Sequence, residues 1–154
     1  MFWKLGEPNE MLSQWYPSKI VENNITFCNA EQYMMYHKAI LFDDVEIAKK
    51  IIKSKCPKTI KALGRKITNF DEDTWAENRE RIIQQGNYLK FSQNDDLKGF
   101  LLACPKNCIF VETSPFDRIY GVGYDEKTAL YHRSKWGLNL LGKALNITYN
   151  KLLN

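Results

Sequence analysis

The sequence contains no hydrophobic run long enough to cross a membrane. Its 154 residues include apolar runs of only a few residues, such as 39–42 and 100–104, whereas a membrane span needs about 20. The first ten residues already contain Lys4, Glu7 and Glu10 and therefore lack the apolar stretch of a secretory signal. We expect a cytoplasmic protein that does not associate with membranes.

Residue types that commonly bind metals are also scarce. The chain has only two histidines and four cysteines. Cys104 and Cys108 resemble half of a metal site, but no second pair of ligands with suitable spacing accompanies them. The glycines of the sequence at 121–123, Gly-Val-Gly, lack the third glycine and the strand–helix context of a dinucleotide fingerprint. We therefore predict no metal, no bound cofactor, and reduced cysteines that are mostly buried.

No internal repeat, low-complexity tract or linker divides the chain. Its side chains are 44% hydrophobic and 13% aromatic, a composition that argues against intrinsic disorder. A chain of this length buries roughly 70% of its unfolded surface when it folds. We predict a single domain over residues 1–154.

Helical periodicity dominates the chain after residue 29. Asn29 is placed to cap the first helix, with Gln32 at the capping-box position. Asp71 opens a long helix, and Gly86 marks its end or a kink. The predicted helices cover 30–41, 43 or 44 to about 55, 57–64, 71–85, 95–103, and 136 or 139 to 152.

One short segment has the composition of a strand. Residues 108–113, Cys-Ile-Phe-Val-Glu-Thr, are rich in apolar and β-branched side chains. Residues 1–29 predict irregular or short extended structure. We therefore expect a mainly α fold with a small β element.

The positive charge of the chain is concentrated in one segment. The net charge is +4, yet residues 49–66 carry eight basic side chains and no acidic one. Such a segment could bind the phosphates of a nucleotide or a nucleic acid. The structural alternative is a pair of helices whose lysines face water.

Seven short motifs follow one another in a fixed order over residues 12–142. They are L-S-Q-W-Y-P at 12–17, A-E-Q-Y-M-M at 30–35 with Lys38-Ala39, A-L-G-R at 62–65, Trp75 with Arg79, K-F-S-Q-N at 90–94 with Leu97, V-E-T-S-P at 111–115 with Asp117-Arg118, and W-G-L-N-L-L-G at 136–142. This ordered set resembles the NADAR family of YbiA-like proteins. The resemblance implies a compact, mostly α fold and hydrolysis of an N-glycosidic bond.

The resemblance also implies two kinds of substrate. One is a phosphorylated ribosylamine intermediate of riboflavin synthesis, and the other is ADP-ribose attached to guanine in a nucleic acid. The chain departs from the family pattern at two positions. Tyr120 replaces the tryptophan of W-G-x-G, so we expect an altered fit of the substrate. Gln32 replaces the histidine of the Glu-His-Tyr motif that some family members have. A mechanism that depends on a histidine at this position is therefore excluded.

Breaking a ribose–nitrogen bond requires a carboxylate near the anomeric carbon and a proton donor for the leaving nitrogen. Glu31, at the centre of a family motif, is the predicted catalytic carboxylate. Its structural alternative is a residue that only complements a helix dipole. Asp117 is the second candidate, and the alternative is an Asx-turn aspartate or a partner of Arg118.

Two lysines are candidates for contact with phosphate. Lys38 follows Glu31 by two helical turns, so that both lie on one helix face. A desolvated lysine there could instead attack the opened sugar and form a Schiff base. The alternative for Lys38 is a surface lysine whose stem packs on the protein. Lys90 is a parallel candidate for the same roles, because Lys90-Phe91 matches the family motif.

Aromatic and polar side chains in the motifs are candidates for binding the base and the ribose. Stacking on a base contributes about 1–3 kcal/mol, although tryptophan in a small domain also commonly belongs to the core. Asn139 could bind a ribose hydroxyl or cap a helix. The predicted binding residues are Trp75, Arg79, Lys90, Trp15, Tyr120, Gly121, Gly123 and Asn139.

Two other functions compete with an N-glycosidase. One is a binding module that senses ADP-ribose or NAD without turnover. In that case Tyr120 and Gln32, which depart from the family pattern, would reflect the loss of catalytic activity. The other is a nucleic-acid-binding protein that uses only the basic segment 49–66. The expected partner is a small phosphorylated riboside or an ADP-ribosylated nucleic acid, and no stable protein partner is predicted.

Overall fold

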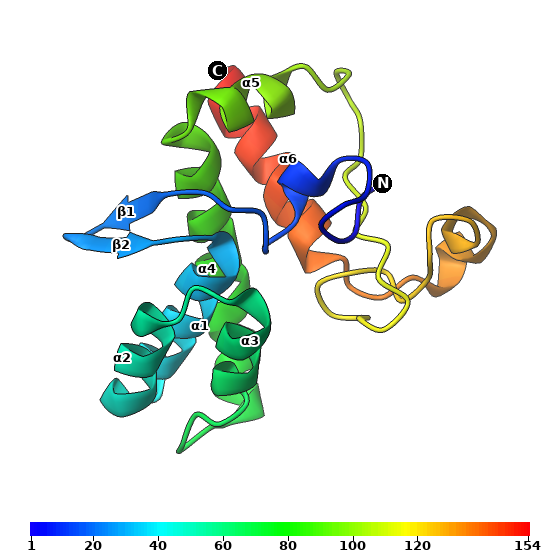
Figure 1. Cartoon of the computed structure of the whole chain (residues 1–154). Helices are drawn as coiled ribbons and strands as arrows, with labels where there is room; N and C mark the ends of the chain where they lie inside the picture. Colours follow the sequence, from blue (N-terminus) through cyan, green and yellow to red (C-terminus); the bar gives the residue numbers. More distant parts are fainter.

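The computed structural model describes residues 1–154 and confirms a mainly α fold with a small β element (Figure 1). The structure has six α-helices, two 3-10 helices and a single short β-hairpin. In chain order the elements are η1 (Glu10–Leu12), β1 (Ile20–Glu22), β2 (Ile25–Phe27), α1 (Ala30–Leu41), α2 (Val45–Lys53), α3 (Pro57–Gly64), α4 (Glu72–Ser92), α5 (Asp95–Leu102), η2 (Ala129–Lys135) and α6 (Leu140–Leu153). None of these helices has both the length and the apolar character of a membrane span.

Three helices begin at capping side chains that the sequence predicts. The Asn29 side chain accepts a hydrogen bond from the Gln32 N–H at 2.7 Å and starts α1. Asp44 caps α2 in the same way and also accepts two hydrogen bonds from Thr68, which ties the start of α2 to the end of the basic segment. Asp71 caps α4. These caps satisfy N–H groups that the first helical turn leaves without partners.

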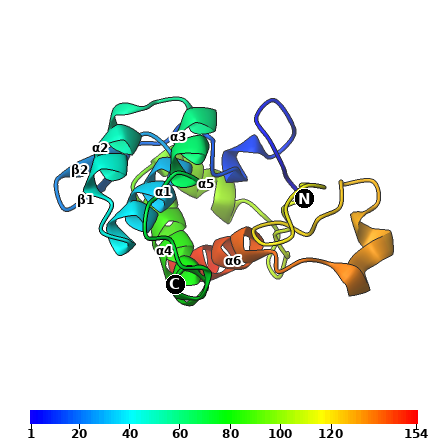
Figure 2. The same ribbon diagram turned by 90° about the horizontal axis from the view of Figure 1, so that it is seen from below.

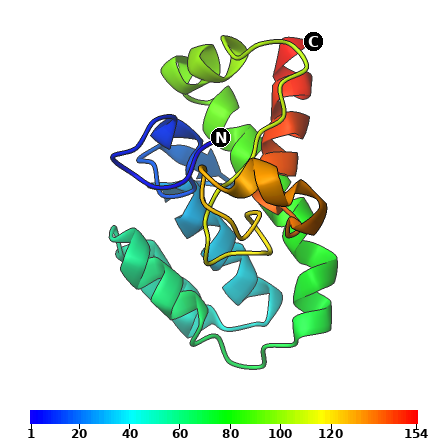
Figure 3. The same ribbon diagram turned by 90° about the vertical axis from the view of Figure 1, so that its right-hand side faces the viewer.

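The helices pack as two connected groups around the long helix α4. Helix α1 packs against α4 and also contacts α2 and α3, which pack against each other, whereas α5 and α6 pack against α4 toward its other end (Figures 1 and 3). The core between them is apolar and fully buried at its centre. Its most buried large side chains include Phe27, Ile51, Ile60, Ile83, Phe91, Leu101 and Leu145.

The strand expected at 108–113 is not formed. The segment is extended, but its only β-type partner is Phe2, which pairs with Glu112 in an isolated parallel bridge. The Phe2 N–H donates to the Val111 carbonyl, and the Thr113 N–H donates to the Phe2 carbonyl. Figure 2 shows the N-terminus beside this loop segment. A β-branched, apolar sequence is therefore insufficient when no neighbouring strand completes the hydrogen bonds.

The true strands lie in residues 1–29, the region expected to have irregular or short extended structure. Ile20–Glu22 and Ile25–Phe27 form an antiparallel hairpin with Ile20 opposite Phe27. The two connecting residues, Asn23 and Asn24, both have positive φ angles of 49° and 64°. Asparagine tolerates this left-handed conformation, which a two-residue hairpin turn needs.

The cysteine prediction is wrong in one respect. All four cysteines are free, but Cys56 is exposed and the other three are half-buried. They therefore contribute little to the centre of the core.

Gly86 neither ends nor kinks the long helix, contrary to the prediction. Helix α4 continues through it to Ser92. A Cβ at Gly86 would lie 2.6 Å from Cδ1 of Tyr33, so the glycine lets α1 approach α4 closely. Helix packing, rather than a chain break, requires glycine here.

Gly86→Ala should destabilise the fold by about 1–3 kcal/mol, because overpacking outweighs the higher helix propensity of alanine. Gly99 in α5 is the matched control, since no atom lies within 4 Å of the position that its Cβ would take. Gly99→Ala should stabilise by about 0.5–1 kcal/mol. Urea unfolding measures both, and a neutral or stabilising Gly86→Ala would contradict the close packing described here.

Candidate active site

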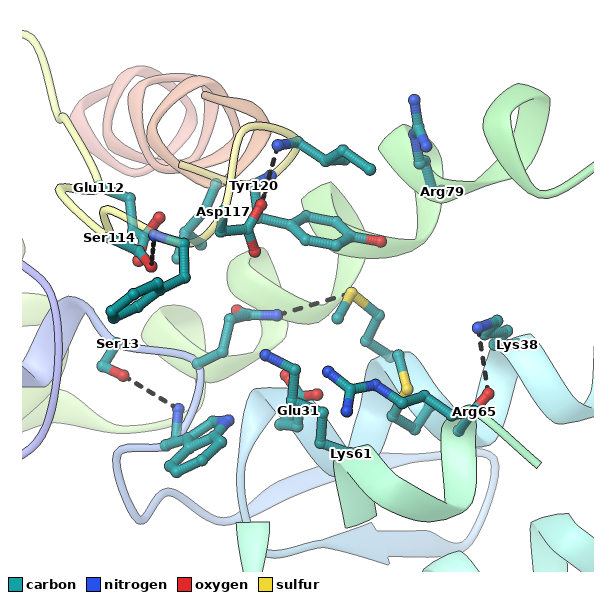
Figure 4. Close-up of a pocket in the computed structure, with 18 of the residues that line it drawn as sticks. Ser13, Glu31, Lys38, Lys61, Arg65, Arg79, Glu112, Ser114, Asp117 and Tyr120 are labelled. Carbon is teal, nitrogen blue, oxygen red and sulfur yellow. Dashed lines mark hydrogen bonds between the residues drawn. The ribbon is translucent and has the colours of Figure 1, made fainter. Parts of the chain in front are cut away.

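A cavity of about 600 Å³ opens between the two halves of the molecule (Figure 4). Its walls come from segments far apart in the sequence: the N-terminal residues, the loop before β1, helices α1, α3 and α4, and the loop 112–120. Cavities of this size hold small organic ligands. The lining includes four carboxyl groups, six aromatic side chains and a group of cations, and the main ones are described in turn.

Glu31 lies in the first turn of α1 with its side chain in the cavity. The Asn29 cap fixes this turn, and the Glu31 N–H also donates to the Gln14 carbonyl at 3.0 Å. The residue is only 5% exposed. Burial raises the pKa of Glu31 to about 7, while Lys61 lowers it and Asp117 raises it further. The carboxyl therefore exchanges its proton near neutral pH.

Asp117 lies on the loop across the cavity from Glu31 (Figure 4). Its Oδ1 accepts hydrogen bonds from the N–H groups of Ile119 and Tyr120, both at 2.8 Å. The Asx-turn alternative is thus what the structure contains, in a residue that also lines the cavity. Arg118 does not pair with it, because that guanidinium donates to the Lys135 carbonyl.

Lys38 and Arg79 supply cations from the helical walls. Lys38 Nζ donates to the Gly64 carbonyl at 3.1 Å and lies over the rings of Phe70 and Trp75. Burial lowers the pKa of Lys38, although the nearby carboxyls of Glu72 and Glu31 oppose this effect. Arg79 forms an ion pair with Glu72 at 3.3 Å.

Only two of the eight basic residues in the segment 49–66 line the cavity, Lys61 and Arg65. They are four residues apart, at the end of α3, and therefore lie on one face. The other six basic residues are exposed to solvent elsewhere. The alternative of lysines that face water therefore holds for these six residues, and phosphate binding by Lys61 and Arg65 stays a prediction.

Aromatic side chains line the remaining cavity wall. Trp75 is 4% exposed and belongs both to the core and to the lining. Tyr120 and Trp15 are half-buried on either side, and burial raises the pKa of Tyr120, which keeps the phenol neutral. Trp3 and Phe116 stand at the cavity edge, with their rings 6.3 Å apart.

Four predicted binding residues lie outside the cavity lining, and we correct their assignment. Lys90 is fully buried, and its Nζ donates to the carbonyls of Met11 and Ser13 at 2.7 and 2.8 Å. Burial lowers the pKa of Lys90 to about 7. It therefore holds the chain just before Gln14 in place, and it does not itself line the cavity.

The other three residues support the loop 112–120 from behind. The Asn139 side chain accepts from the Glu112 N–H and donates to the Phe110 carbonyl. A Cβ at Gly121 would collide with the Glu112 carboxyl, and Gly123 has a φ of +77°. These glycines and Asn139 therefore shape the loop and do not line the cavity.

Two carboxyl groups of the cavity, Glu112 and the exposed Glu72, were not predicted from the sequence, and only Glu112 is buried. Its side chain is 8% exposed. Burial and the neighbouring Asp117 raise the pKa of Glu112 to about 8, while the Ser114 N–H and Lys61 lower it. Glu112 could have been selected as the acidic residue of the V-E-T-S-P motif. It also lies in the apolar segment 108–113, which predicts a strand and therefore a structural role.

Residues 1–153 match the NADAR domain model. The chain belongs to the NADAR family. It is 44% identical over 142 residues to N-glycosidase R617 of Acanthamoeba polyphaga mimivirus, an alignment that covers 88% of this chain and 83% of that protein. It is also 34% identical over 154 residues to protein irg-1 of Caenorhabditis elegans, covering 88% of this chain and 72% of that protein.

The fold agrees with the NADAR family assignment. The NMR structure of the Escherichia coli protein YbiA superposes with a TM-score of 0.80 at 22% sequence identity, covering 99% of this chain and 83% of that one. The YbiA-like helical fold expected from the motifs is therefore confirmed. The expectation of a hydrolase acting on N-glycosyl bonds agrees with the name of the mimivirus relative.

Glu31→Gln should stabilise this NADAR domain at alkaline pH. The pKa of Glu31 is raised from 4.5 to about 7 in the folded protein, so the folded protein keeps a proton that the unfolded chain releases. Stability from this group is complete below about pH 4.5 and falls as the pH rises to 7. The variant removes this loss and should gain on the order of 2 kcal/mol above pH 7, measured by urea unfolding at several pH values.

Glu46→Gln is the matched control for this prediction. Glu46 is the second residue of α2, as Glu31 is of α1, but it is exposed to solvent. Its substitution should lower stability by no more than about 1 kcal/mol through the helix dipole. A pH-independent effect of Glu31→Gln would show that the buried carboxyl is not the titrating group.

Proposed function

We propose that this chain is an N-glycosidase that hydrolyses the bond between C1 of a phosphorylated ribose and the nitrogen of a heterocyclic base. The observation that carries the proposal is a buried Glu31 facing Asp117 across a cavity lined by cations and aromatic rings. The name of the mimivirus relative, N-glycosidase R617, supports the same class of reaction. The proposed substrates are a riboflavin-synthesis intermediate or ADP-ribose linked to guanine.

Glu31 and Asp117 act at the anomeric carbon in this proposal. Cleavage of the C–N bond develops positive charge on C1 and the ring oxygen, which a nearby carboxylate stabilises. Glu31 in its ionised form also accepts a proton from the attacking water. Its pKa of about 7 suits that task near neutral pH. The cationic centre lies between the two carboxylates, and both stabilise its positive charge.

The cations of the cavity bind the phosphate of the substrate. Lys61 and Arg65 extend from the end of α3, and Arg79 extends from the opposite wall of α4 (Figure 4). Charge-assisted hydrogen bonds to phosphate are among the strongest available to a protein side chain. The base then lies against Trp75, Tyr120 or Trp15, where stacking contributes about 1–3 kcal/mol. No cofactor is required by these steps.

Lys38 is placed for two roles. As an ammonium group it adds to the positive potential that binds phosphate. As an amine, which burial favours by lowering its pKa, it could attack C1 of the opened sugar and form a Schiff base. Borohydride added during turnover would leave the mass of the reduced sugar on Lys38 only in the second case.

Wild-type protein should cleave the ribose–nitrogen bond of one of four compounds and release the nitrogen-containing group and a ribose-containing product, and Glu31→Gln should reduce that rate by roughly 10²–10⁴-fold. The compounds are the phosphorylated aminopyrimidine riboside, NAD, ADP-ribose and an oligonucleotide with ADP-ribosylated guanine. Mass spectrometry of the products measures turnover. The compound that is cleaved identifies the substrate class.

The exposed variant Glu46→Gln is the control and should turn over at the wild-type rate. Binding of ADP-ribose without turnover of any compound would contradict the enzyme and support a sensor of ADP-ribose or NAD. A Glu31→Gln variant with full activity would reject Glu31 as the catalytic carboxylate.

Lys61→Ala and Arg65→Ala should each raise KM for the cleaved substrate by about tenfold or more, because each loses a charge-assisted contact with phosphate. Lys58→Ala is the matched control, since Lys58 lies on the same helix, is exposed and does not line the cavity. Steady-state kinetics on all three variants make the comparison. Equal effects at Lys58 and Lys61 would indicate a general electrostatic attraction instead of a phosphate site.

A further inference from the structure

The proposed hydrolysis needs a proton donor for the leaving nitrogen, and neither histidine of the chain can provide it. His37 lies 2.9 Å from Glu22 on the outer side of α1, and His132 stacks on Tyr124 in η2. Neither lines the cavity. The donor must therefore be another titratable side chain of the lining.

Glu112 is the carboxyl of the cavity that is held most firmly. The Asn139 side chain accepts from its N–H at 3.1 Å, and its carbonyl accepts from the Val122 N–H at 2.9 Å. Phe2 pairs with the residues on both sides of it. The backbone of Glu112 is thus fixed by three separate segments, while its side chain lines the cavity (Figure 4).

The side chain of Glu112 has few partners that stabilise a buried anion, namely the Ser114 N–H and the charge of Lys61. It forms no ion pair, and its Oε2 is inaccessible to solvent and has no hydrogen-bond partner. That oxygen rests against Gly121, where any Cβ would collide with it. Burying an ionised carboxylate that has no ion-pair partner costs on the order of several kcal/mol. The neutral, protonated form of Glu112 is therefore favoured. Its pKa of about 8 agrees with this state.

The other acids of the lining are less suited to donate a proton. Asp117 already accepts two N–H groups through Oδ1, so it is arranged as an acceptor. Glu31 must lose its proton to activate water. Burial raises the pKa of Tyr120, and its phenol therefore holds its proton too strongly.

We propose, on the basis of the N-glycosidase function above, that Glu112 is the catalytic acid that donates a proton to the departing nitrogen. The C1–N bond breaks, its electron pair stays on nitrogen, and the Glu112 proton joins that nitrogen. Water supplies hydroxide to C1 and a proton to Glu31. Return of that proton through solvent to Glu112 restores both groups, so that atoms and charge balance.

This assignment also explains the residues behind the loop. Asn139 and Gly121 are positioning residues, because the first holds the backbone of Glu112 and the second leaves room for its carboxyl. A side chain at position 121 would displace the acid from the cavity wall.

The test compares two leaving groups. One substrate is the phosphorylated aminopyrimidine riboside, whose nitrogen needs a proton, and the other is 4-nitrophenyl riboside 5-phosphate, whose nitrophenolate leaves without one. Glu112→Gln should lower kcat by roughly 10²–10⁴-fold on the first and leave kcat within about threefold on the second. Glu31→Gln should impair both, and the exposed variant Glu46→Gln should impair neither.

The pH profile supplies an independent measurement. Wild-type activity on the aminopyrimidine riboside should fall as the pH rises through about 8, where Glu112 ionises in the field of Asp117 and Lys61. This alkaline limb should be absent with the nitrophenyl substrate and in Glu112→Gln.

Three results would overturn the assignment. Equal loss on both substrates in a Glu112→Gln protein with a wild-type circular dichroism spectrum and Tm would indicate a structural role. Full activity of the variant on both substrates would exclude any role in catalysis. Absence of turnover of both substrates by the wild-type protein would refute the N-glycosidase itself and the acid with it, a result distinct from the first two.

Discussion

The cavity depends on how the extended segment 110–113 is held in place. Most helices of this fold form their own hydrogen bonds, but this segment has no strand beside it and must find partners elsewhere. Phe2 supplies one side, and the Asn139 side chain bridges Phe110 and Glu112 on the other. Asn139 itself has a φ of 51°, a conformation that asparagine tolerates better than most residues. The N-terminus, the loop and the start of α6 are thereby joined at the cavity wall.

Charge separation within the cavity follows from this arrangement. The loop contributes only acidic groups, Glu112 and Asp117, whereas the end of α3 contributes only cations, and α1 and α4 each contribute one acid and one cation. Glu31 and Glu112 are both buried, and burial raises the pKa of each. Neither carboxyl improves the stability of the fold at neutral pH, which is typical of residues that are kept for chemistry.

The buried lysine illustrates how an ionisable group can serve structure instead. Lys90 has no carboxylate partner, and its ammonium group is satisfied by two backbone carbonyls of residues 11 and 13. Gln14 and Trp15 follow at once and line the cavity. Gln32 has a similar role, since its amide links the start of α1 to the end of α2 through Ile51 and Ser54. Family motifs therefore include framework residues as well as residues of the site.

The sequence by itself determined the helices and the family. Caps at Asn29, Asp44 and Asp71 are local interactions between residues three apart, so the positions where α1, α2 and α4 begin could be read from the chain. Glu31, Lys38 and Asp117 belong to motifs that can be recognised in the sequence without knowledge of the fold. Only the tertiary structure decided that Glu112 lines the cavity, that Lys90 and Asn139 do not, and that Gly86 lies inside a helix. Each of these outcomes depends on contacts between segments distant in sequence, such as Tyr33 with Gly86 or Asn139 with Glu112, and no local pattern encodes such contacts.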